Sequence, residues 1–207
     1  MKIFVVRHGQ TDWNKKRKLQ GCSDIPLNEI GRKMAKDVAL ALQKIPFIVA
    51  FTSPLVRASE TAKIILEGRS VPLFEDSRLR EMEFGEYEGW RCEEGNCDLP
   101  ADFFHFFNAP DKYVPPKGGE SYEIVHKRIH SFLAELYVNQ KYKDASVLIT
   151  AHGAVLNLIL HDVEKTPWKD LGRRGLLKNG SVTEIDVENG VPCVKSIGDI
   201  AEKNREL

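Results

Sequence analysis

The amino-acid sequence predicts a three-layer α/β/α sandwich with a mostly parallel central sheet. Short apolar segments alternate with longer segments whose apolar residues recur every three or four positions. Two of the short segments end in the same dipeptide, at His8-Gly9 and at His152-Gly153. Ligands of open α/β sheets bind beyond the carboxyl ends of the strands. Both histidines are therefore expected at the ligand-binding edge of the sheet.

The short segments are the expected strands, because they are rich in β-branched and aromatic residues. They cover residues 1–6, 47–52, 71–74, 146–150, 182–187 and 192–197. Between the last two, Asn189-Gly190 is a dipeptide typical of a two-residue hairpin turn. The chain is thus expected to finish in a β-hairpin.

The longer segments are the expected helices. Residues 28–45 carry apolar side chains at helical spacing, and Ser53-Pro54 is a typical helix start for a helix over residues 54–66. Further helices are expected over residues 122–140 and from about Gly153. These helices supply the two outer layers.

Residues 88–120 differ from the rest because prolines and glycines interrupt them. We expect a small cap-like insertion here, within a single domain that spans residues 1–207. Its aromatic cluster, Phe103 to Phe107, is consistent with core packing and equally with a substrate entrance. The sequence leaves both interpretations open.

The charge balance excludes a global electrostatic field, since 30 lysines and arginines face 30 aspartates and glutamates. We therefore expect no nucleic-acid partner, and no apolar run is long enough for a membrane helix. The four cysteines form no CxxC pair, and Cys92 and Cys97 are expected as free thiols. No signal peptide is evident, which favours a cytoplasmic protein. The basic run Lys15 to Lys18 is expected to be a solvated loop.

Four cationic or potentially cationic side chains are expected to converge on one crevice. Arg7 and His8 end the first strand, Arg57 lies in the first turn of a helix, and His152 ends a later strand. Arginines bind phosphate oxygens bidentately, so the set suits a phosphoryl group. A neutral His8 is then placed to attack phosphorus and become phosphohistidine.

A carboxylic acid must still protonate the leaving group. The stretch Leu79 to Gly89 supplies Glu81, Glu83, Glu86 and Glu88. In an extended segment Glu81 and Glu83 project to the same side, so spacing does not separate them.

The motifs together resemble those of the histidine phosphatase superfamily, which includes the cofactor-dependent phosphoglycerate mutases. They are R-H-G-Q-T at Arg7 to Thr11, Q-G-C-S-D-I-P-L at Gln20 to Leu27, S-P-L-V-R-A-S-E-T at Ser53 to Thr61, L-R-E-M-E-F-G-E-Y-E-G at Leu79 to Gly89, G-G-E-S at Gly118 to Ser121 and A-H-G at Ala151 to Gly153. They occur in family order and span most of the chain. The resemblance implies a phosphoglycerate mutase-like fold.

The resemblance also implies a role for each site residue. His8 corresponds to the phosphorylated nucleophile and Glu81 to the proton donor, while Arg7, Arg57 and His152 correspond to the phosphate pocket. The further residues implied in binding substrate or phosphate are Asn14, Gln20, Gly21 and Gly153. No metal and no cofactor are implied.

The compact motifs and the length of 207 residues look more like the small broad-range phosphatases and α-ribazole phosphatases than like the longer mutases. We therefore expect a metal-independent phosphatase that hydrolyses a small-molecule phosphomonoester. The alternatives are a phosphoglycerate mutase, which is an isomerase, and a phosphate-binding module without turnover. The sequence leaves open the substrate and whether the protein forms a homodimer.

His126 and His130 lie four residues apart on a predicted helix, a spacing that allows them to share a metal ion. The sequence shows no third ligand beside them and no His-Glu-x-x-His pattern. The favoured interpretation is a helix face exposed to solvent.

Overall fold

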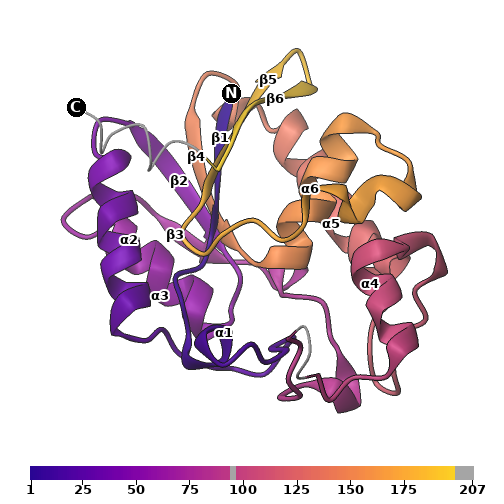
Figure 1. Ribbon diagram of the computed structural model, residues 1–207. Helices are drawn as coiled ribbons and strands as arrows, with labels where there is room; N and C mark the ends of the chain where they lie inside the picture. Colours follow the sequence, from indigo (N-terminus) through magenta and orange to yellow (C-terminus); the bar gives the residue numbers. More distant parts are fainter. Residues whose placement is uncertain (94–96, 199–207) are drawn as a thin grey trace.

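The strands of the computed structural model, which describes residues 1–93 and 97–198, form one sheet between helical layers (Figure 1). Within this part of the chain the strand order is β3-β2-β4-β1-β5-β6. The bounds are Lys2–Arg7 for β1, Phe47–Thr52 for β2, Leu73–Glu75 for β3, Ser146–Ala151 for β4, Val182–Glu188 for β5 and Val191–Ile197 for β6. The pairs β3/β2, β2/β4 and β4/β1 are parallel, whereas β5 and β6 join as an antiparallel hairpin. The predicted mostly parallel sheet is confirmed.

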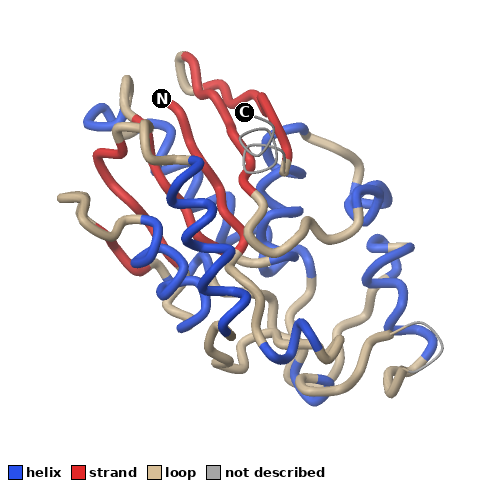
Figure 2. Tube along the Cα trace, turned by 60° about the vertical axis from the view of Figure 1, so that its left-hand side comes forward, coloured by secondary structure: helices blue, strands red, loops and turns tan. Residues whose placement is uncertain are grey.

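The helices cover both faces of the sheet. They are α1 at Asp12–Lys15, α2 at Glu29–Ala41, α3 at Val56–Ile65, α4 at His105–Asn108, α5 at Tyr122–Val138 and α6 at Gly153–Glu164. Helices α2 and α3 lie on one side of the strands, and α5 and α6 lie on the other (Figures 1 and 2). The predicted three-layer sandwich is therefore confirmed.

Alternation along β1 explains the two layers of core. Ile3 and Val5 join the apolar cluster that includes α5 and α6, whereas Phe4 and Val6 join the cluster that includes α2. Successive side chains of a strand point to opposite faces, so a strand buried on both faces is apolar throughout. Because β1 is buried on both faces, His8, which follows it directly, is buried as well.

Several predicted helix ends are wrong, and helix α5, for example, ends at Val138 rather than residue 140. Helix α3 starts at Val56 rather than residue 54, since the backbone of Leu55 is still extended and the carboxylate of Asp24 accepts from the Val56 N–H at 2.7 Å. That remote cap sets the start in place of Ser53. Helix α2 ends at Ala41 rather than residue 45. Pro46 disfavours helical geometry at the preceding residue, so the chain leaves the helix before it.

The segment predicted as a cap forms short helical turns around α4. Phe103 and Phe106 are buried in the core on the α5 and α6 side. The predicted domain span and cap include residues 94–96 and 199–207, which lie outside the described residues. The single domain and the cap remain predictions.

The C-terminal hairpin forms as predicted. Asn189 and Gly190 have φ angles of 52° and 78°, the positive values that a type I′ turn requires. Among the helices described, none has the length and apolar character needed to cross a membrane.

Candidate active site

The register of two parallel strands brings the two strand-end histidines together. Arg7 of β1 pairs with Ala151 of β4, so His8 and His152 follow at equivalent positions. Their ring centroids lie 5.2 Å apart, and the two side chains are almost completely buried. Neighbouring strands are about 4.8 Å apart. The sheet itself therefore sets the separation of the two rings.

One hydrogen bond defines the tautomer of His8. Its Nδ1 lies 2.7 Å from the carbonyl oxygen of Gly9. A carbonyl only accepts hydrogen bonds, so Nδ1 carries the proton and Nε2 keeps its lone pair. Burial, and then the charges of Arg57 and Arg7, hold the pKa of His8 well below its ordinary value. At neutral pH this imidazole is neutral, as a nucleophile must be.

Arg57 is almost wholly buried at the start of α3. Its guanidinium donates to the carbonyl oxygens of Ser23 at 2.8 Å and Gly21 at 2.7 Å, which fixes its plane. Arg7 is anchored in the same way by the Leu177 carbonyl. Each arginine keeps a buried Nε–H with no hydrogen-bond partner among the described residues. Both cations therefore have donor capacity left for an anion.

The structure separates the two carboxylates that spacing left equivalent. Glu81 is 8% exposed, and its carboxylate accepts from the N–H groups of Met82 at 3.0 Å and Ala154 at 3.2 Å. It lines a pocket of about 90 Å³ together with His8 and Arg57. Glu83 is instead half-exposed and paired with Arg80. Glu81 is the carboxylate that the fold brings to His8.

The predicted polar wall also lies at this pocket. Asn14, Gln20 and Gly21 line it. The Gln20 Oε1 accepts from the Thr11 hydroxyl at 2.9 Å, and the Asn14 Oδ1 accepts from the Thr11 N–H at 3.1 Å. These contacts fix both amides beside His8.

The glycines serve as spacers. Gly21 has a φ of 52°, and a Cβ there would lie 2.0 Å from the Glu88 carboxylate. Gly153 does not line the pocket; a Cβ on it would lie 3.4 Å from the Arg7 guanidinium. Each glycine therefore admits a charged side chain at close range.

His152 lies behind His8, fully buried and without a hydrogen-bond partner for either ring nitrogen among the described residues. Burial, Arg57 and His8 lower its pKa well below the ordinary value. Its ring is therefore a neutral polar group able to donate to or accept from a ligand.

Two residues that help to build the site were missed from the sequence. The Glu88 carboxylate accepts from the N–H groups of Cys22 and Ser23, both at 2.8 Å, and so shapes the loop that anchors Arg57. Asn179, in the loop before β5, donates to the His8 carbonyl oxygen at 3.0 Å. Glu88 was identified only as one of four acids, and no motif marked Asn179.

A larger cavity of about 650 Å³ adjoins the small pocket and shares Arg7 and Asn14 with it. Arg17 and Lys18 also line this cavity, so the solvated-loop prediction for residues 15–18 is incomplete. Phe106 and Phe107 border the small pocket while Phe103 is buried in the core. The core-packing interpretation of the aromatic cluster is therefore confirmed, and its use as a substrate entrance stays a prediction.

Comparison with known proteins agrees with this geometry. Residues 3–200 match the histidine phosphatase superfamily (branch 1). The chain belongs to this family.

Two curated relatives and one solved structure illustrate the family's range. The chain is 35% identical to the uncharacterized phosphatase PhoE of Bacillus subtilis, over 78% of this chain and 76% of that protein. It is 33% identical to the 2,3-bisphosphoglycerate-dependent phosphoglycerate mutase 2 of Gloeobacter violaceus, over 92% of this chain and 83% of that one. The structure of YhfR from Bacillus stearothermophilus superposes with a TM-score of 0.85 at 34% identity, covering 93% and 94% of the two chains. Family and relatives support a phosphatase, and hence a hydrolase.

Proposed function

We propose that the protein is a metal-independent phosphatase that hydrolyses a small-molecule phosphomonoester through a phosphohistidine on His8. The observation that carries the proposal is the neutral imidazole of His8 in a pocket with the buried Arg57, the partly buried Arg7, and Glu81. This set combines a nucleophile, a cationic phosphate site and a proton donor. Hydrolysis through a phosphohistidine requires no further group.

In the first step, His8 Nε2 attacks phosphorus and the ester P–O bond breaks as the P–N bond forms. The leaving alkoxide takes the proton of the Glu81 carboxyl group and departs as the alcohol. Arg7 and Arg57 stabilise the negative charge on the equatorial oxygens during transfer. His152 does not line the pocket but packs against the His8 ring, and as a neutral imidazole without a hydrogen-bond partner among the described residues it can donate to a phosphoryl oxygen once the group is on His8.

In the second step, the Glu81 carboxylate accepts a proton from water as the water oxygen attacks phosphorus. The P–N bond breaks, its electron pair returns to His8 Nε2, and inorganic phosphate leaves. Glu81 is then protonated again for the next cycle. The larger adjoining cavity is the space for the remainder of the substrate, consistent with an α-ribazole phosphate, phosphoserine or a sugar phosphate.

Hydrolysis of p-nitrophenyl phosphate with and without EDTA tests the reaction, and a panel of metabolite phosphates then identifies the substrate by phosphate release. We expect equal turnover under both conditions. Loss of turnover on chelation contradicts the metal-independent mechanism. No turnover on any ester supports the phosphate-binding module instead.

A phosphoglycerate mutase is the second candidate, because the relatives include such an enzyme. A mutase returns the phosphoryl group to a bound glycerate, whereas a phosphatase transfers it to water. Assay of 3-phosphoglycerate with catalytic bisphosphoglycerate separates the two. Efficient 2-phosphoglycerate formation with little free phosphate would replace our proposal.

A further inference from the structure

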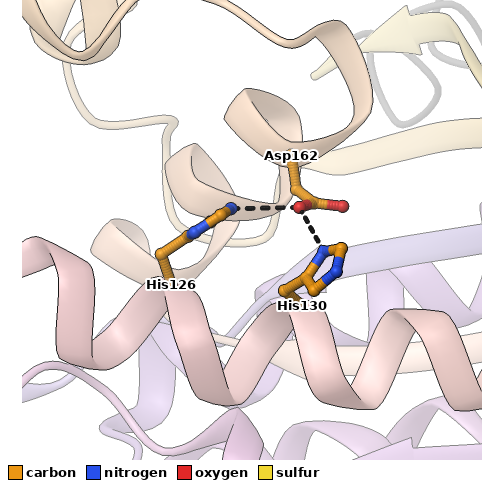
Figure 3. Close-up of side chains that lie close together, drawn as sticks. All are labelled: His126, His130 and Asp162. Atoms are coloured by element: carbon orange, nitrogen blue, oxygen red, sulfur yellow. Dashed lines mark hydrogen bonds and ion pairs between the residues drawn. The ribbon is translucent and has the colours of Figure 1, made fainter.

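Three side chains from two helices meet far from the phosphate pocket. His126 and His130 lie one turn apart on α5, and Asp162 lies on α6 (Figure 3). The His126 Nε2 is 3.0 Å from Asp162 Oδ1, and the His130 Nδ1 is 2.8 Å from the same oxygen. All three potential ligand atoms lie within 4.8 Å of one another. Asp162 is thus the third potential ligand that the sequence around the two histidines does not show.

The burial of Asp162 distinguishes this cluster from an ordinary surface ion pair. Its side chain is only 4% exposed, compared with 25% for His126 and 57% for His130. Burial by itself raises the pKa of Asp162. The hydrogen bond from His130 and the charge of Lys165 outweigh this effect, so the pKa lies below its ordinary value. An ionised carboxylate is therefore held inside the protein with two imidazoles directed at one oxygen.

The donor set indicates which ion would fit. Two imidazole nitrogens with one carboxylate oxygen suit Zn²⁺ and neighbouring transition metals, whereas Mg²⁺ and Ca²⁺ prefer oxygen ligands. In a tetrahedral zinc site the ligand atoms are about 3.3 Å apart. The separations of 2.8 and 3.0 Å from Asp162 Oδ1 widen slightly as the ion replaces the shared protons, and the two imidazole nitrogens, within 4.8 Å of each other, must adopt the same spacing.

Neighbouring side chains restrain His126 and compete with a metal ion for Asp162. The ring of His126 packs against His161 and Trp168, with centroids 5.2 and 5.4 Å away, which restrains its orientation. The Lys165 ammonium lies 3.7 Å from Asp162 Oδ1, but its side chain is 72% exposed and free to turn into solvent. A bound cation would displace it.

We propose that His126, His130 and Asp162 bind one Zn²⁺ ion that links α5 to α6. Asp162 is eight residues along α6 from Ala154, which lines the phosphate pocket, and this separation is about 12 Å at 1.5 Å per residue. The ion takes no part in the phosphoryl chemistry. The ion instead stabilises the fold, because it joins α5 to α6. Helix α6 contributes the Ala154 N–H, and Arg128 of α5 donates to the Glu81 carbonyl oxygen at 3.1 Å.

Zinc titration of the untagged, EDTA-treated protein by calorimetry tests the site, with thermal unfolding measured in parallel. We expect one ion per chain and a higher Tm with zinc. The double variant His126→Gln/His130→Gln should lose at least 100-fold in affinity and the increase in Tm. The matched control His105→Gln should keep both, since it removes an imidazole on α4 that belongs neither to this cluster nor to the residues that line the phosphate pocket. Absence of stoichiometric binding, or equal binding by the histidine variant, overturns the proposal.

Two single variants keep the test decisive if the double variant does not fold. Asp162→Asn preserves shape but removes the charge and should weaken zinc binding at least 10-fold. Lys165→Gln removes the competing ammonium and should tighten binding several-fold. Unchanged affinity in both overturns the proposal. Turnover of p-nitrophenyl phosphate below the Tm should be the same in all these variants, which separates this site from the phosphatase mechanism.

Discussion

The Glu81 Oε2 accepts a hydrogen bond from the Ala154 N–H, 3.2 Å away in the first turn of the helix that follows His152. The proposed proton donor is thereby held at a position defined by the sheet and by α6. We predict that Glu81→Gln lowers kcat by about 10²- to 10⁴-fold, since an amide N–H is not acidic enough to protonate the leaving group. Glu83→Gln, the matched control, should change kcat less than about threefold. Steady-state hydrolysis of p-nitrophenyl phosphate measures both, and the opposite order reassigns the acid.

His8→Ala should abolish the phosphoenzyme, because Nε2 is the nitrogen available for attack. Rapid quenching with radiolabelled substrate measures acid-labile, base-stable phosphate on the protein. The control His105→Ala removes a histidine that does not line the pocket and should retain the label. Label that persists on the His8 variant rules out this nucleophile.

Arg57→Lys should impair both binding and stability. A lysine keeps the charge but cannot reach the Gly21 and Ser23 carbonyls with a rigid fork. We expect kcat/KM to fall by about 10²-fold or more and the free energy of unfolding to fall by about 1–3 kcal/mol. Urea denaturation and steady-state kinetics check the two effects. Wild-type kinetics in the variant contradict a role in binding phosphate.

Glu88→Gln should act indirectly, through the loop that anchors Arg57. The charged acceptor of three backbone N–H groups, those of Cys22, Ser23 and Phe84, becomes a neutral one, at a cost of about 1 kcal/mol in unfolding free energy. We expect kcat/KM to fall several-fold, mainly through a higher KM, because the pocket is displaced rather than removed. The rate at saturating substrate should therefore be closer to that of the wild type. Glu86→Gln on the same segment is the control. If both variants behave alike, the positioning role is wrong.

The depressed pKa of His152 predicts how stability depends on pH. The unfolded histidine titrates near its ordinary 6.5, whereas the folded one stays neutral well below it. Below about pH 6.5 the unfolded chain binds more protons than the folded one, so the free energy of unfolding falls as the pH falls. Above that pH the contribution of His152 to this free energy is constant. The slope from one such group approaches about 1.4 kcal/mol per pH unit. Urea denaturation from pH 5 to 8 should show a shallower slope for His152→Asn, and an identical slope contradicts the depressed pKa.

Local patterns predict the strands and the two His-Gly ends, because a strand buried on both faces is apolar at every position. They do not predict where α3 begins, since Asp24 caps it from a distant part of the chain. For the same reason Asn179 and Asp162 carry no sequence signal. Their partners, His8 and the α5 histidines, lie 171 and at least 32 residues away. The choice between Glu81 and Glu83 came from family resemblance, and the structure supplies its physical basis in the Ala154 N–H.

The pairing of Arg7 with Ala151 has a consequence for how new specificities can arise in this scaffold. The gap between His8 and His152 is a property of the backbone ladder, so exchanging side chains elsewhere leaves it unchanged. Phe106 and Phe107, by contrast, border the pocket from a segment outside the sheet. Random libraries confined to residues 97–120 should therefore redirect substrate choice while the transfer step is retained, whereas a one-residue deletion in β1 should end activity on every ester at once.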